Sequence, residues 1–118
     1  MRSMARLSTI MVALTALTAC GSKPIVGVLL PTTGAASTYG EAMKEGIDMA
    51  VDQARSEGSL PAGFAVLWAD SASDPATAAS ELKRLSSEGA RIVVAGTTSG
   101  EAKALLPVMD RTDTLVLS

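Results

Sequence analysis

Histidine is absent from this 118-residue sequence, and cysteine, tryptophan, tyrosine and phenylalanine occur once each. Without an imidazole, the chain has no histidine general base and no histidine ligand for a metal ion. The single cysteine, Cys20, excludes an internal disulfide and a metal site built from a cysteine cluster. We therefore expect no metal, no cofactor and no enzymatic activity.

Positive and negative charges also nearly balance, so neither sign predominates. Ten lysines and arginines stand against twelve aspartates and glutamates, so the formal net charge is −2. Proteins that bind nucleic acids carry basic patches, often with aromatic residues between them, and aromatics make up only 3% of this chain. Nucleic acid is therefore not an expected partner. A hydrophobic share of 47% suits one small α/β domain.

The first 19 residues have the pattern of a secretory signal peptide. Arg2 and Arg6 precede an uncharged run, Leu7–Ala19, whose length falls within the roughly 7–15 residues of the apolar segment in such peptides. The run is shorter than the about 20 residues that a membrane-spanning helix needs. We therefore expect the protein to be secreted across the cytoplasmic membrane.

The segment LTAC at positions 17–20 resembles the lipobox of bacterial lipoprotein signal peptides. This resemblance implies cleavage before Cys20 and attachment of a diacylglyceryl group to its thiol. The alternative is an ordinary signal peptide, with this cysteine buried or present by chance. We predict the lipoprotein, with residues 1–19 as signal peptide and residues 20–24 as lipidated tether. The anchor would hold the protein in the periplasm or on the outer face of the cell membrane.

After the tether, the sequence predicts a buried strand, a loop of small residues and an amphipathic helix. The near-continuous apolar run 25–30 is typical of a parallel strand that is covered on both faces. Thr38-Tyr39-Gly40-Glu41 fits the S/T-x-x-E capping box, so we expect the helix to start at Thr38. An apolar stripe at helical spacing then predicts one face packed on the sheet; its members are Met43, Ile47, Ala50, Val51 and Ala54.

Strands and helices continue to alternate along the chain. Residues 64–69 are predicted to form a second strand. Asp74 and Pro75 mark the start of the next helix, and Gly89 would cap its C-terminus. The apolar face of this helix would hold Ala78, Leu82 and Leu85. Residues 91–96 are the third predicted strand and residues 114–118 the fourth. Between these two strands, Thr98-x-x-Glu101 repeats the capping-box pattern at the start of a third helix. Pro107 should kink or shorten this helix. Its apolar side would hold Ala102, Leu105, Leu106 and Met109.

This βαβαβαβ order predicts an α/β fold with a parallel, doubly wound sheet of strand order 2-1-3-4. Ligands of such sheets bind beyond the carboxyl ends of the strands, where the order reverses. The facing loops are 31–38 and 96–100, and both lead into a helix N-terminus, which suits a carboxylate.

The candidate ligand-binding residues are the hydroxyls of Thr98 and Ser99 and the ring of Tyr39. Thr98 or Ser99 could instead merely cap its own helix, and Tyr39 could pack on the loop.

Three segments together resemble branched-chain amino acid (Leu/Ile/Val) ABC-transporter substrate-binding proteins, which are type I periplasmic binding proteins. They are VGVLLPTTGAASTYGEAMKEGIDMAVDQA, ADSASDPATAASELKRL and GTTSGEA. The resemblance implies that residues 25–118 are part of an N-terminal lobe. It also implies an amino acid as ligand, a transporter permease as partner, and ligand contacts at Tyr39, Thr98, Ser99 and Ser118. Family members close a second lobe over the ligand, so we expect this chain to be a fragment or the product of a truncated gene. Thr97 departs from the family, where a proline is frequent.

The sequence leaves two other functions open. One is a lipoprotein regulator or sensor that uses the same fold to bind a protein partner, as cell-wall synthesis activators do. The other is an enzyme with Asp70 and Asp74 as paired carboxylates or a phosphoacceptor. Because Pro75 follows Asp74, the sequence favours a helix cap at Asp74 over catalysis.

Overall fold

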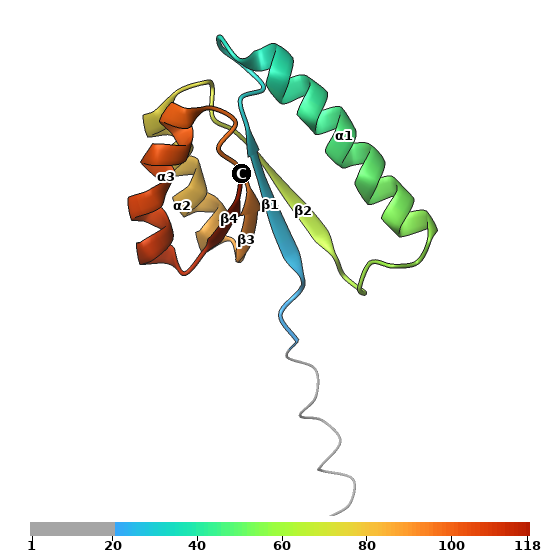
Figure 1. The fold of residues 1–118 in the computed structure, drawn as a ribbon. Helices are drawn as coiled ribbons and strands as arrows, with labels where there is room; N and C mark the ends of the chain where they lie inside the picture. The colour runs from blue at the N-terminus through green and yellow to red at the C-terminus, as the bar shows by residue number, and fades with distance from the viewer. Residues whose placement is uncertain (1–20) are drawn as a thin grey trace, which may run out of the picture.

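The computed structural model describes residues 21–118, in which strands and helices alternate (Figure 1). The predicted signal peptide and the lipidation of Cys20 lie outside the described residues. The elements are β1 Ile25–Leu30, α1 Ser37–Ser56, β2 Ala65–Asp70, α2 Pro75–Ser87, β3 Ile92–Val94, α3 Ser99–Thr112 and β4 Leu115–Leu117.

The four strands form one parallel sheet of order β2-β1-β3-β4, which confirms the predicted fold class and strand order. β1 pairs with β2 along its whole length, while β3 and β4 contribute three residues each and are shorter than expected. Figure 1 shows α1 on one side of the sheet and α2 with α3 on the other. The order reverses between β1 and β3, and the loops that follow these strands therefore face each other.

The core lies between the sheet and the α2–α3 layer. Gly27 of β1 lets α2 approach the sheet, because a Cβ atom there would lie 2.9 Å from Val93 and 3.2 Å from Leu85. The predicted apolar stripe of α2 is fully buried. The core cluster consists of Leu29, Ala78, Leu82, Leu85, Ala90, Val93, Ala95, Leu105 and Val108.

Two of the three predicted helix starts are confirmed. The Asp74 carboxylate accepts a hydrogen bond from the Thr77 N–H at 2.7 Å, with Pro75 at the first helical position. Thr98 and Glu101 form the complete capping box of α3. At the end of α2, Gly89 adopts a φ of +102°, and the neighbouring N–H groups bond back to the helix as in a Schellman motif.

The predicted cap at Thr38 is wrong. Helix α1 begins at Ser37, its N-cap is Ala36, and no side chain caps it. Thr38 therefore lies inside the first turn with an exposed side chain. The N-cap lies two residues before the predicted one, and its N–H donates to Ser73 Oγ in the loop that follows β2, at 2.9 Å, so Thr38 is already helical and cannot act as N-cap. The stripe on α1 is also narrower than expected, since Ala50 and Met43 are exposed.

Helix α3 differs from its prediction in two respects. Leu106 was expected on the packed side but is 60% exposed, while Glu101, Leu105 and Val108 are buried. The helix also runs through Pro107 to Thr112, so the expected shortening does not occur. Pro107 lies on the exposed side of the helix, where water can replace the N–H that proline lacks as partner of the carbonyl four residues earlier.

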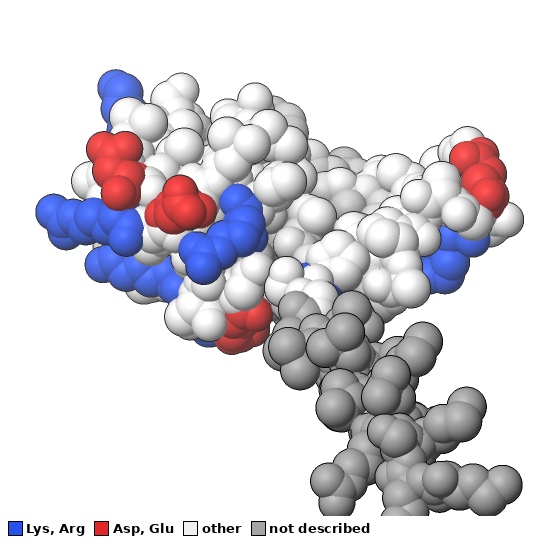
Figure 2. All heavy atoms as spheres, turned by 90° about the horizontal axis from the view of Figure 1, so that it is seen from below, with Lys and Arg blue, Asp and Glu red and all other residues white. Residues whose placement is uncertain are grey.

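One face of the sheet is open over β3 and β4. Val93 and Val116 point into the α2–α3 layer, so their neighbours point to the opposite face. There Ile92, Leu115 and Leu117 are 42%, 55% and 50% exposed. Figure 2, seen from below, shows acidic and basic side chains intermingled at the two ends of that view with uncharged surface between them. No helix within residues 21–118 is long and apolar enough to cross a membrane.

Candidate functional site

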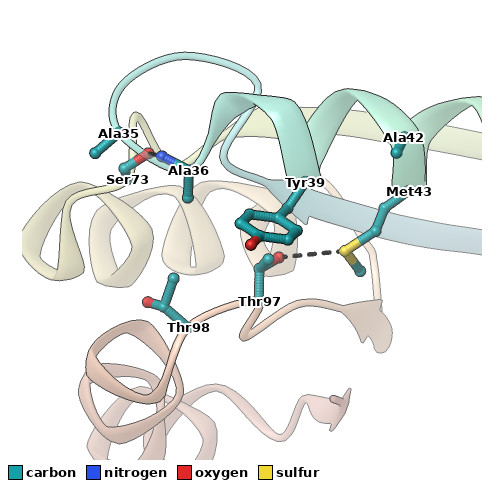
Figure 3. Close-up of a pocket in the computed structure, with 8 residues that line it drawn as sticks. All are labelled: Ala35, Ala36, Tyr39, Ala42, Met43, Ser73, Thr97 and Thr98. Carbon is teal, nitrogen blue, oxygen red and sulfur yellow. Dashed lines mark hydrogen bonds between the residues drawn. The ribbon is translucent and has the colours of Figure 1, made fainter.

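A hollow of about 570 Å³ lies at the carboxyl edge of the sheet, where the strand order reverses (Figure 3). It is the place that the topology predicts for a ligand. The loop after β1, the first turns of α1, the loop after β2 and the start of α3 surround it. Its lining residues are Ala35, Ala36, Tyr39, Ala42, Met43, Ser73, Thr97 and Thr98.

The α1 side of the hollow is an apolar wall. Small alanine side chains leave room beside the helix, and Met43 and Tyr39 project from successive turns over the hollow (Figure 3). The side chain of Tyr39 is 71% exposed, so its ring is not packed away against the loop. The wall can therefore take up an aliphatic or other apolar group of a ligand.

The opposite side is the polar start of α3. Thr98 lines the hollow, but its hydroxyl accepts from the Glu101 N–H at 3.3 Å and donates to the Glu101 carboxylate at 3.0 Å. Ser99 is exposed and is not among the lining residues. As the first two residues of the helix, Ser99 and Gly100 present N–H groups that have no partner inside the helix. This end of α3 suits an anion such as a carboxylate.

Thr97, which the sequence reasoning noted only as a departure from the family, occupies a central place. Its hydroxyl lies 3.7 Å from the sulfur of Met43, across the hollow from α1 (Figure 3). A second hollow of about 320 Å³ shares Met43 and Thr97 with the first and extends to Ser118. The Ser118 hydroxyl is 3.4 Å from the Gly96 carbonyl oxygen. Tyr39, Thr98 and Ser118 thus lie on adjoining surfaces, whereas Ser99 stands at the rim.

The start of α3 is held in place by Glu101, whose side chain is only 2% exposed. One carboxylate oxygen accepts from the Thr98 N–H and hydroxyl, and the other accepts from the Ser71 hydroxyl in the loop after β2. The capping-box pattern predicted the first set of contacts. The bond to Ser71 has no sequence signal, because it joins residues thirty positions apart.

The loop after β1 is held by Asp70, at the end of β2. Its carboxylate accepts hydrogen bonds from the Thr32 and Thr33 N–H groups, the Thr33 hydroxyl and the Ala72 N–H, at 2.6–3.2 Å. Burial by itself would raise the pKa of Asp70, but the bonds from Thr33 and Ala72 outweigh it and leave the pKa below its usual value of 3.8. The pKa of Asp74 is lowered as well, mainly by the Thr77 N–H.

Asp70 and Asp74, the candidate pair of carboxylates, therefore both hold the backbone of nearby loops and helix starts in place. Among residues 21–118 there is also no group of three or more cysteine, aspartate or glutamate side chains arranged to hold a metal ion.

An open parallel sheet with an apolar-walled hollow at its switch point is the arrangement of an α/β ligand-binding domain. The chain belongs to the periplasmic binding protein family, whose profile matches residues 25–118. This confirms the resemblance seen in the sequence.

The relatives of this chain include proteins named for the amino acids that they bind. Leu/Ile/Val-binding protein BraC3 of Rhizobium johnstonii is 35% identical over 86 residues, which are 72% of this chain and 23% of that protein. Leu/Ile/Val-binding protein homolog 3 of Brucella melitensis is 28% identical over 79% of this chain and 26% of its own length. The chain thus spans about a quarter of the length of these relatives.

The fold also matches a solved structure. The branched-chain amino acid transporter substrate-binding protein LivJ of Streptococcus pneumoniae, determined in complex with isoleucine, superposes with a TM-score of 0.74 at 25% identity. The match covers 80% of this chain and 28% of LivJ.

Proposed function

We propose that this protein is the extracytoplasmic solute-binding component of an ABC importer and that its solute is an amino acid of the branched-chain type. The observation that carries the proposal is the hollow itself, which sets an apolar wall on α1 opposite the N-terminus of α3. A branched-chain amino acid has the matching pair of features, an aliphatic side chain and a carboxylate.

In this proposal the carboxylate binds at the first turn of α3. The N–H groups of Ser99 and Gly100 and the hydroxyl of Ser99 are the donors, and the helix dipole favours the negative charge. Thr98 contributes through its cap, which fixes this turn. The aliphatic side chain lies against Tyr39 and Ala42 of α1 and against the alanines that precede the helix.

Ser118, on the adjoining hollow, is the fourth proposed contact. Residues 25–118 would then form part of an N-terminal lobe.

The signal peptide and Cys20 would place the protein on the outer side of the cytoplasmic membrane, held by a lipid, where it would deliver its solute to a transporter permease. A lipoprotein regulator with the same fold, binding a protein partner, was the alternative from sequence. The relatives named for leucine, isoleucine and valine favour the solute-binding function instead.

Calorimetric titration of the complete product of the gene with leucine, isoleucine and valine tests the proposal. We expect at least one of them to bind. Ser99→Ala combined with Thr98→Ala should weaken binding by about 1.5–3 kcal/mol, as for the one hydrogen bond to a charged group that the Ser99 hydroxyl would supply. Ser80→Ala, an exposed serine on α2, is the matched control and should change nothing.

The Thr98 substitution also removes a helix cap, so thermal unfolding of each variant must be compared. Thr98→Ser keeps the capping hydroxyl and should retain both stability and affinity. Failure of all three amino acids to bind the unaltered protein would refute the proposed function.

A further inference from the structure

The wall of the hollow depends on two loops that interlock at the carboxyl edge of the sheet. Gly34, in the loop after β1, has a φ of +84°, and a Cβ atom there would lie 2.5 Å from the Ala72 carbonyl oxygen and 2.8 Å from Ser73 Oγ. Ala72 and Ser73, in the loop after β2, are themselves left-handed, with φ values of +51° and +58°. Two consecutive non-glycine residues in this conformation are unusual, and such strain persists only where the surroundings impose it.

Ser73 makes contacts that hold it in this left-handed conformation. Its hydroxyl donates to the Thr33 carbonyl oxygen at 2.8 Å and accepts from the Ala36 N–H at 2.9 Å. Ala36 is the N-cap of α1, and an alanine has no side chain with which to cap its own helix. In a capping box, the N–H of the N-cap residue receives a partner from within the helix. Here a residue 37 positions away supplies that partner.

The consequence is that a neighbouring loop fixes where α1 begins. With the Ala36 N–H bound to Ser73, the carbonyl of Ala36 accepts from the Tyr39 and Gly40 N–H groups and starts the first turn. This turn carries Tyr39 over the hollow, and Ala36 and Ser73 both line it (Figure 3). Asp70 secures the other end of the same loop through Thr33.

We propose that Ser73 is a positioning residue of the ligand site, which through its hydroxyl bonds to Ala36 and Thr33 sets the start of α1 and so the placement of Tyr39. This inference rests on the proposed function for its effect on affinity, but not for its effect on the loop. Ser73 acts through α1, and its left-handed conformation aims its hydroxyl at the N-cap.

The loop offers a matched pair of variants. Ser73→Gly and Ala72→Gly each relieve one left-handed residue and change the backbone in the same way, because glycine adopts positive φ without strain. Only Ser73→Gly removes the hydroxyl. Both should be made in the complete product of the gene and measured for amino acid affinity and for hydrogen exchange of the Ala36 and Ala78 amides without ligand.

For Ser73→Gly we expect faster exchange at Ala36 without change at Ala78, which lies in α2. Affinity should weaken about three- to tenfold, because the loosened start of α1 no longer holds Tyr39 in place. Ala72→Gly should change none of these quantities. Faster exchange at both amides would mean general destabilisation and would overturn the proposal. Equal effects of the two variants, or an affinity that survives Ser73→Gly, would overturn it too.

If the unaltered protein binds none of leucine, isoleucine and valine, the proposed function fails separately. Exchange at Ala36 in the ligand-free variants then still decides whether Ser73 holds the start of α1.

Discussion

Two glycines of α1, Gly40 and Gly46, provide a sharp test of how this helix is packed. Both lie inside the helix, where alanine is normally better by about 0.5–1 kcal/mol because it loses less backbone entropy. A Cβ atom at Gly46 would meet nothing within 4 Å. At Gly40 it would lie 2.1 Å from the carbonyl oxygen of Pro31 and 2.5 Å from the carbonyl carbon.

The obstacle at Gly40 is backbone, so no side chain can rotate away. Pro31 is buried, and the next residue, Thr32, is held by hydrogen bonds from its N–H to the Leu30 carbonyl and to Asp70. Gly40→Ala must therefore displace α1. Forcing extra atoms into a packed site costs about 1–3 kcal/mol, which outweighs the gain in helix propensity.

We expect Gly46→Ala to stabilise the protein by about 0.5–1 kcal/mol and Gly40→Ala to destabilise it by about 1–2 kcal/mol. Urea unfolding of the complete gene product, followed by circular dichroism, measures both. Because the displacement moves Tyr39, Gly40→Ala should also weaken amino acid binding, whereas Gly46→Ala should leave it unchanged. Equal stabilisation by the two substitutions would show that the close approach of α1 to Pro31 is incorrect.

Four further predictions concern the stability, the pH dependence, the membrane anchor and the open sheet face. Glu101→Ala should cost about 2–4 kcal/mol of unfolding free energy by leaving buried donors unpaired, while Glu88→Ala, which removes an exposed ion pair, should cost at most about 1 kcal/mol in the same urea experiment. Because folding lowers the pKa of Asp70, the ionised carboxylate stabilises the folded protein at a pH above 3.8, its ordinary pKa, and this contribution is lost as the pH falls through the pKa of the folded state. The difference in unfolding free energy between the unaltered protein and Asp70→Asn should therefore shrink below about pH 4. Cys20→Ser should move the protein from the detergent to the aqueous phase of Triton X-114, since acyl chains supply about 0.8 kcal/mol per buried CH₂, and unchanged partition would contradict lipidation. A chain of residues 21–118 should bind a hydrophobic dye and self-associate through its open sheet face, less so with Leu117→Lys; a monomeric mass at tens of micromolar without dye binding would contradict this.

Much of the candidate site could be predicted because its elements carry local signals. Strand order 2-1-3-4 places the two loops together, and the Thr98-x-x-Glu101 pattern fixes the start of α3. The contributions of Thr97 and Ser73 could not be predicted in the same way. Each depends on a contact with α1 or its loop made across more than thirty positions of the chain.

Local periodicity and capping chemistry were enough to predict the alternation of strands and helices, their parallel order and the cap at Asp74. Two identical T-x-x-E patterns, however, had different outcomes in the folded chain. Thr98-x-x-Glu101 forms a capping box and Thr38-x-x-Glu41 does not, because α1 already begins at Ser37, next to Ala36, whose N–H donates to Ser73. The same pattern therefore marks a helix start only where long-range contacts leave the N-cap at its first residue, and the folded chain alone decides that.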